Sequence, residues 1–143
     1  MFEKFRNIIR WIFVLWKYDH PYEMDTIYPL IKHKLQCFKE EMILSKGIWR
    51  EGEQERLDTC IKLLDQLIEN DFIKAEQKAF DEKYGKCNLD QISLSYSKAK
   101  TIEEKAFASV EYSKLMHLED SKRHQVRLKL FMLLTNNIDK WWI

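Results

Sequence analysis

The chain has 143 residues, with 24 Lys and Arg against 23 Asp and Glu, 45% hydrophobic and 13% aromatic residues, three Gly and two Pro. This apolar and aromatic content excludes intrinsic disorder, and the scarcity of Gly and Pro excludes a collagen-like or linker chain. The length favours one domain over residues 1–143. A net charge of +1 argues against a duplex DNA-binding domain, which usually concentrates basic side chains on one face.

The first third of the sequence predicts two amphipathic helices. Apolar residues at steps of three and four predict a helix over about residues 2–17, which ends before Pro21. A second series with the same spacing predicts a helix over about residues 26–45. Asp25 is its expected N-cap, and Gly47 is expected to close it in the left-handed conformation.

The middle of the chain predicts one long helix followed by an irregular connection. Helical periodicity continues without interruption over residues 53–84, and Gly85 is expected to end this helix. Between residues 86 and 100 the periodicity fails, because apolar residues alternate with serines there. The alternating apolar residues are Ile92, Leu94 and Tyr96. This pattern predicts a short extended segment or an ordered loop that serves as a crossing connection.

The last third predicts a helix that begins at a capping box. Thr101 followed by Glu104 is the pair of residues that such a box requires, so a helix is expected to start at residue 102. A helix of about forty residues would be long for a domain of this size, which favours a break near residues 118–121. Together these elements predict an all-α fold, a four- or five-helix bundle with one irregular serine-rich connection.

Cysteine usage and hydropathy predict a cytoplasmic protein. The three cysteines are odd in number, far apart and without a CxxC pair, so they suggest neither a disulfide framework nor a zinc site. The apolar run from Trp11 to Trp16 is too short for a signal peptide and lacks a cleavage site of small residues. No stretch approaches the roughly 18 apolar residues that span a bilayer, so no membrane association is expected.

Metal and catalytic sites are not expected, and neither is a cofactor. The Glu-x-x-His motif of dimetal bundles is missing from the sequence. His117, Asp120 and His124 share one helical stripe and could contact a divalent ion, but a solvated polar stripe explains them equally well. His33 and Cys37 lie one turn apart, a spacing able to lower a thiol pKa, yet coincidence explains this pair. Three glycines leave no room for a phosphate-binding loop.

The densest basic patch of the sequence lies near its C-terminal end, where no acidic residue occurs from Ser121 to Ile138. Arg123 and Arg127 are one turn apart and could hold one anionic group together. Aromatic rings elsewhere could stack on the base of a nucleotide. The candidate ligand-binding residues are Lys122, Arg123, His124, Arg127, Trp16 and Tyr28. The alternative is a solvated helix face that pairs with the acidic segment over residues 53–84.

Trp141 and Trp142 predict a second packing surface. Adjacent residues on a helix point about 100° apart, so both rings do not easily bury in one small core. One ring is therefore expected to meet another surface, and a homodimer interface is the simplest choice.

Four segments resemble those of small, mostly uncharacterised accessory proteins of tailed bacteriophages. They are Trp16 with Asp19, Lys32-x-Lys34-Leu35, Leu63-Leu64-Asp65-x-Leu67-Ile68 and Trp141-Trp142. The resemblance covers residues 10–85 and the last few positions, and no catalytic residue carries over. It implies a bacterial cytoplasm as the setting and counter-defence by binding as the role.

Two functions follow from these observations. In the first, the protein is a non-enzymatic binder that sequesters a small anionic ligand such as a nucleotide signal. In the second, it is a protein-interaction module that binds and inhibits a host protein.

Overall fold

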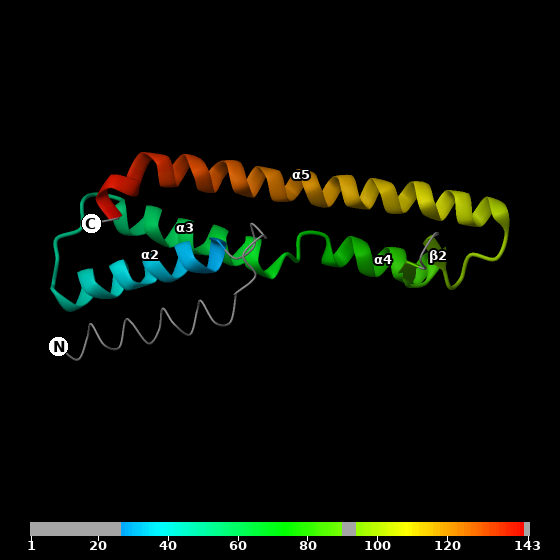
Figure 1. Ribbon diagram of the computed structural model, residues 1–143, viewed down its shortest axis with the longest axis horizontal. Helices are drawn as coiled ribbons and strands as arrows, with labels where there is room; N and C mark the ends of the chain where they lie inside the picture. The colour runs from blue at the N-terminus through cyan, green and yellow to red at the C-terminus, as the bar shows by residue number, and fades with distance from the viewer. Residues whose placement is uncertain (1–26, 90–93, 142–143) are drawn as a thin grey trace. The chain divides into compact units, whose positions relative to one another are not determined.

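The computed structural model describes residues 27–89 and 94–141 and is mostly helical, which confirms the all-α class (Figure 1). The predicted bundle of four or five helices and the single domain stay predictions. Contacts divide the described chain into two compact units, a first unit of residues 27–70 and 126–141 and a second unit of residues 71–89 and 94–125. Five sequence predictions lie outside the described residues: the helix over residues 2–17, Trp16, the N-cap Asp25, Ile92 and Trp142.

Two antiparallel helices, α2 (Ile27–Leu44) and α3 (Glu53–Glu69), lie side by side in the first unit (Figure 1). Lys32 pairs with Asp65, and the Lys39 ammonium lies 2.6 Å from the Asp58 carboxylate. Because both partners step by seven residues in opposite directions, these pairs fix the register over two turns. Between them the helices bury the apolar residues Tyr28, Leu35, Leu57, Cys60, Leu63, Leu64 and Leu67. The predicted helix over residues 26–45 is confirmed as α2.

The residue that closes α2 in the left-handed conformation is not the one that the sequence predicted. Lys46, not Gly47, takes the left-handed conformation, with φ of 51°. The Lys46 N–H donates to the Ile43 carbonyl, and the Gly47 N–H donates to the Met42 carbonyl at 2.9 Å, which is the Schellman pattern. A Cβ at Gly47 would lie 2.8 Å from the Met42 Cε, the end of a flexible side chain that can shift away.

The predicted continuous helix over residues 53–84 is wrong, because the chain turns after α3 and begins α4 at Lys74 (Lys74–Tyr84). Asn70 adopts φ of 55° and donates its N–H to the Gln66 carbonyl at 3.0 Å, which closes α3. Asn tolerates this left-handed conformation better than other non-glycine residues. Phe72 lies four residues after Ile68 and keeps the apolar spacing intact across the turn, so periodicity alone concealed it. Gly85, with φ of 79°, ends α4 as predicted.

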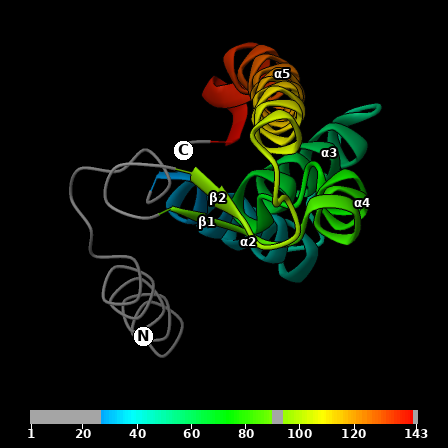
Figure 2. The ribbon, with the colours of Figure 1, turned by 90° about the vertical axis from the view of Figure 1, so that its right-hand side faces the viewer.

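A small antiparallel hairpin of β1 (Cys87–Leu89) and β2 (Leu94–Tyr96) follows α4 in the second unit (Figure 2). Cys87 pairs with Tyr96, and Leu89 pairs with Leu94. The predicted extended segment is confirmed as β2, whereas β1 was missed because the alternation of apolar residues and serines that marks residues 92–97 does not extend to residues 87–89. The hairpin delivers Tyr96 to the core of this unit, which consists of Phe80, Tyr96, Ala99 and Ala108, with Tyr84, Cys87, Tyr112 and Leu115 packed against it.

One unbroken helix, α5 (Ile102–Trp141), completes the described chain, so the predicted break near residues 118–121 is wrong. No Gly or Pro interrupts residues 102–141, and ion pairs support this stretch, since Lys122 reaches α4 and Arg123 pairs within α5. The capping box is confirmed: Thr101 Oγ1 accepts the Glu104 N–H, and Glu104 Oε2 accepts the Thr101 N–H, both at 3.1 Å. Residues 102–125 of α5 belong to the second unit and the remainder to the first.

Candidate functional site

Lys122, the first residue of the predicted anion site, is already bound within the second unit. Its ammonium lies 2.6 Å from the Glu76 carboxylate on α4 and donates a second hydrogen bond to the Phe72 carbonyl at 3.1 Å. The hydrogen bond from Lys122 holds the pKa of Glu76 below its usual range. An anionic ligand would therefore compete with a carboxylate for Lys122.

The other cations of the predicted site are dispersed. Arg123 pairs with Glu119 and with Asp120, both on α5 itself. His124 is exposed. Arg127 belongs to the first unit, and its buried Nε has no hydrogen-bond partner within residues 27–89 and 94–141. Lys122 and Arg123 thus each contact a carboxylate, and Arg123 and Arg127 do not form a free pair of cations for an anionic ligand.

The predicted aromatic residues are mostly inaccessible. Tyr28 is buried in α2, and its hydroxyl has no hydrogen-bond partner in the described part of the chain. A buried ring cannot stack on a ligand without rearrangement. Trp141 is only 1% exposed within a single chain, so its burial requires no second copy. Its role as an interface residue stays a prediction.

The other candidate groups offer little chemistry. Cys37 Sγ and His33 Nε2 lie 3.6 Å apart on α2, which brings the predicted pair into contact. Burial raises the pKa of the Cys60 thiol to about 11, so this cysteine is a poor nucleophile. Nowhere in the described chain do three His, Cys, Asp or Glu side chains gather to hold a metal ion. None of the described helices combines the length and hydropathy needed to cross a membrane.

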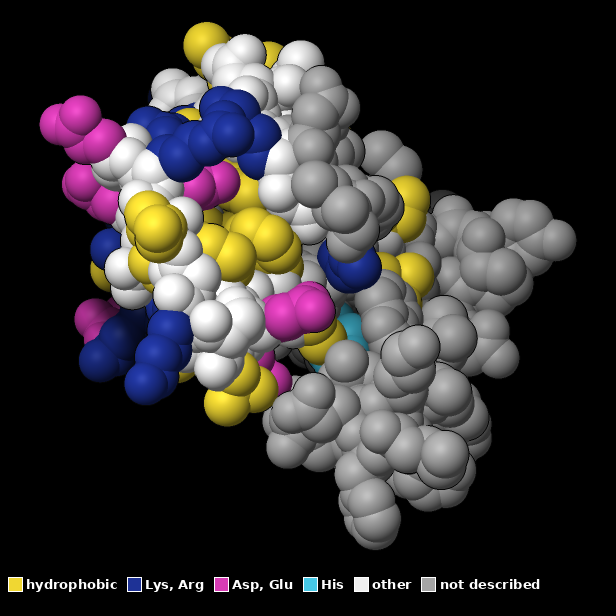
Figure 3. All heavy atoms as spheres, turned by 90° about the vertical axis from the view of Figure 1, so that its left-hand side faces the viewer, with side chains coloured by type: hydrophobic (Ala, Val, Ile, Leu, Met, Phe, Trp, Pro, Cys, Tyr) yellow, Lys and Arg dark blue, Asp and Glu magenta, His cyan; other side chains and the backbone are white. Residues whose placement is uncertain are grey.

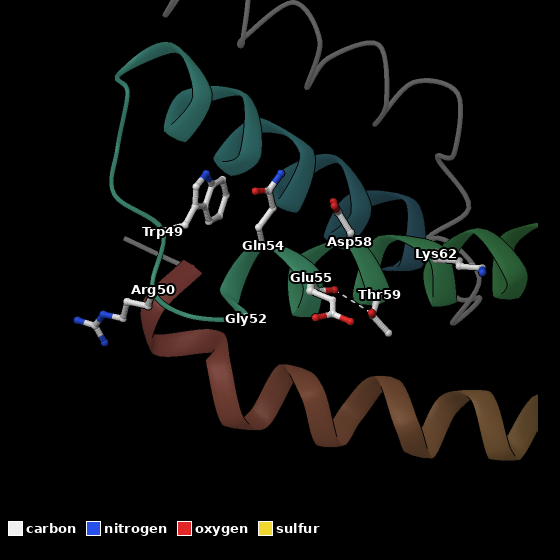
Figure 4. A pocket seen from close by; sticks show the side chains of 8 residues that line it. All are labelled: Trp49, Arg50, Gly52, Gln54, Glu55, Asp58, Thr59 and Lys62. Carbon is white, nitrogen blue, oxygen red and sulfur yellow. Dashed lines mark hydrogen bonds between the residues drawn. The ribbon is translucent and has the colours of Figure 1, made fainter.

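Sequence reasoning missed a groove of about 570 Å³ on the first unit, formed by the α2–α3 loop and the start of α3 (Figure 4). Its lining residues are Trp49, Arg50, Gly52, Gln54, Glu55, Asp58, Thr59 and Lys62. The Trp49 indole packs edge-on against Phe38 of α2, with ring centroids 6.1 Å apart. Gln54 and Asp58 point to the same side of α3 as Trp49, whereas Arg50 points away from them. We call this feature the Trp49 groove.

Local backbone chemistry positions the loop beside α3. Gly52, with φ of 67°, occupies the N-cap, and a Cβ there would lie 3.0 Å from the Arg56 guanidinium. Buried Glu53 accepts the Arg50 N–H at 3.0 Å, and Arg56 donates to the Glu51 carbonyl at 3.1 Å. A signal for this turn was present in the sequence, since a tryptophan lies between two of the three glycines.

The charges of the Trp49 groove suit binding better than catalysis. Asp58 pairs with Lys39, and the Thr59 hydroxyl donates a hydrogen bond to the Glu55 carbonyl at 2.8 Å. Thr59 and Asp58 therefore do not act as a nucleophile and its general base. Lys62 has no carboxylate within ion-pair distance among the described residues. The groove therefore places charges of both signs and an amide beside one aromatic ring.

Exposed aliphatic residues adjoin the Trp49 groove in sequence. Ile48 is 93% exposed, and Ile43 and Leu44 in the last turn of α2 are also exposed. We call these three residues the loop surface. On the face of the molecule that carries the α2–α3 loop, hydrophobic side chains lie open among charged ones (Figure 3). Aliphatic side chains gathered at one loop are typical of an interaction site.

No family model matches this chain, and no curated protein or solved structure matches it either. What the chain does therefore has to follow from its own side chains.

Proposed function

We propose that the protein is a non-enzymatic protein-interaction module that binds its partner through the loop surface and the Trp49 groove. The resemblance to phage accessory proteins implies a bacterial protein as the partner and inhibition of that protein as the effect. This is the second of the two functions that the sequence suggested.

The exposure of Ile48 is the observation that carries this proposal. An isoleucine that is 93% exposed buries almost no apolar surface within its own chain, and Ile48 directly precedes a tryptophan that lines a groove. Protein interfaces commonly combine such a central apolar and aromatic anchor with a polar rim. Arg50, Gln54 and Lys62 supply polar groups for that rim.

Sequestration of a small anionic ligand is less well supported by the same side chains. Lys122 and Arg123 each contact a carboxylate, and Tyr28 is buried. A nucleotide would have to displace Glu76 and Glu119 from these cations, at the cost of ion pairs that link or brace the helices.

Affinity capture with a matched pair of variants tests the proposal. The tagged wild-type protein, Ile48→Glu and Ile102→Glu are each incubated with bacterial lysate, and the retained proteins are quantified by mass spectrometry. Ile102 on α5 is the control because it is 88% exposed and lies outside the loop surface. We expect the wild type and Ile102→Glu to retain one defined protein that Ile48→Glu loses, because a buried carboxylate at the anchor is costly.

Circular dichroism first establishes that both variants keep the wild-type helix content. Equal retention by Ile48→Glu and Ile102→Glu would contradict the proposal. Native mass spectra of the purified protein supply the competing outcome: a nucleotide-sized mass increment that denaturation removes would favour sequestration instead.

A further inference from the structure

We infer that the groove between α4 and the first half of α5 is a second docking site, and that it takes an amphipathic helix with acidic side chains beside its apolar stripe. This inference goes beyond the proposed function, because the groove lies entirely within the second unit and shares no residue with the loop surface. We call it the α4–α5 groove.

The α4–α5 groove has a volume of about 400 Å³ and a regular helical construction. Each helix contributes four residues at positions i, i+3, i+4 and i+7, which is the spacing of a single helix face. The lining residues are Glu76, Ala79, Phe80 and Lys83 from α4, and Glu111, Lys114, Leu115 and Leu118 from α5. Two neighbouring helices with such faces leave a channel in which a third helix can lie.

Ion pairs hold the two walls of the α4–α5 groove at a fixed spacing. Lys83 lies 2.9 Å from Glu111, and Lys122 lies 2.6 Å from Glu76. Because α4 and α5 run antiparallel in this unit, the two pairs brace opposite ends of the groove (Figure 1). A partner therefore meets a preformed channel, which lowers the entropic cost of binding.

The floor of the α4–α5 groove is apolar and continues onto exposed surface. Phe80, Leu115 and Leu118 line it, and Leu118 remains exposed. Phe107 is 67% exposed and lies four residues before Glu111, so it extends the same ridge of α5 by about one turn beyond the groove lining. An amphipathic helix would cover these rings and leucines with its apolar stripe.

The charge of the rim selects the occupant. The lining holds two lysines, Lys83 and Lys114, and two glutamates; Lys83 pairs with Glu111, and Lys122, which lies outside the lining, pairs with Glu76. Lys114 is therefore the lining charge that no carboxylate approaches within ion-pair distance among the described residues. A carboxylate beside the apolar stripe of the incoming helix would pair with Lys114, whereas a lysine there would be repelled.

Two synthetic helical peptides test this inference on the full-length protein. Both carry the same leucine stripe at helical spacing; the flanking residues are glutamate in the acidic peptide and lysine in the basic peptide. Fluorescence anisotropy of the labelled peptides gives their Kd values. We expect the acidic peptide to bind at least about tenfold more tightly than the basic one. Charge reversal in Lys114→Glu should remove that preference, and Leu118→Asp should weaken both peptides.

Lys105→Glu is the matched control, because Lys105 is exposed on α5 and lies outside the groove lining. We expect it to keep the preference for the acidic peptide. Equal affinity for the two peptides, no binding of either peptide, or an equal loss of affinity in Lys105→Glu and Lys114→Glu would each overturn the inference. Ile48→Glu should leave peptide binding unchanged, so the outcome is separable from that of the proposed function.

Discussion

Thr101 and Glu104 cap the start of α5 reciprocally, because each side chain accepts a hydrogen bond from the backbone N–H of the other at 3.1 Å. Thr101→Ala removes one of these acceptors and leaves the Glu104 N–H without its partner. We expect the free energy of unfolding to fall by about 1 kcal/mol, as for other lost N-caps. Urea denaturation followed by circular dichroism measures this change.

Thr101→Ser is the control, since it keeps the hydroxyl that accepts the bond. It should stay within a few tenths of a kcal/mol of the wild type. A serine variant as unstable as the alanine variant would show that the methyl group of Thr101, not its oxygen, matters.

Acid sensitivity should depend on the carboxyl of Glu76. The hydrogen bond from Lys122 lowers the pKa of Glu76 in the folded chain, so the folded state favours the ionised form. A lowered pKa contributes stability above the unfolded value of about 4.3, and this contribution is lost as the pH falls through the folded pKa. We expect Glu76→Gln to be less stable than the wild type at pH 7 and to approach it at low pH. Thermal unfolding between pH 7 and pH 3 tests this expectation, and a stability difference independent of pH would refute it.

Sequence patterns located most helix ends but not the turn within residues 53–84. The capping box at Thr101 and the positive φ at Gly85 depend on local sequence, so the residue types at these positions were enough to predict them. The turn at Asn70 was concealed because Phe72, four residues after Ile68, continues the apolar spacing across it. The break in α5 was predicted from helix length, and it is wrong because residues 102–141 contain no Gly or Pro that would interrupt a helix, while ion pairs at Lys122 and Arg123 add support.

The candidate site was harder to predict than the helices. A charge count over the basic patch could not show that Glu76, 46 residues away, binds Lys122. Likewise, helical spacing says nothing about a loop, so the exposure of Ile48 emerged only from the fold. Contacts between residues far apart in the sequence determine both the pairing of Lys122 and the exposure of Ile48, and a single sequence does not reveal such contacts.

The left-handed backbone at Asn70 predicts opposite behaviour for two small substitutions. Asn70→Ala should lower the free energy of unfolding by about 1 kcal/mol, because a Cβ without a polar group is disfavoured at φ of 55°. Asn70→Gly removes the steric penalty and should stay close to the wild type. Urea denaturation of both variants provides the comparison, and an alanine variant more stable than the glycine variant would argue for a helix that continues through residue 70.

Thiol reactivity should separate Cys60 from the other two cysteines. Burial raises the pKa of Cys60 to about 11, so at pH 8 its thiol stays protonated as well as inaccessible. Cys37 and Cys87 are half-buried. We expect a thiol-disulfide reagent to label Cys37 and Cys87 in the folded protein and Cys60 only after unfolding. Peptide mapping locates the labels, and early labelling at Cys60 would mean that α3 opens readily.

Trp141 tests whether the C-terminal tryptophans serve the core or a homodimer interface. The indole is 1% exposed within one chain, so Trp141→Ala should lower the free energy of unfolding by about 3–5 kcal/mol, the usual cost of deleting a buried tryptophan. Met132→Ala, an exposed substitution on the same helix, should have little effect. Light scattering and melting at several protein concentrations distinguish the two roles. A core residue gives a loss of stability that does not depend on concentration, whereas an interface residue lowers the oligomer mass and makes the melting temperature rise with concentration.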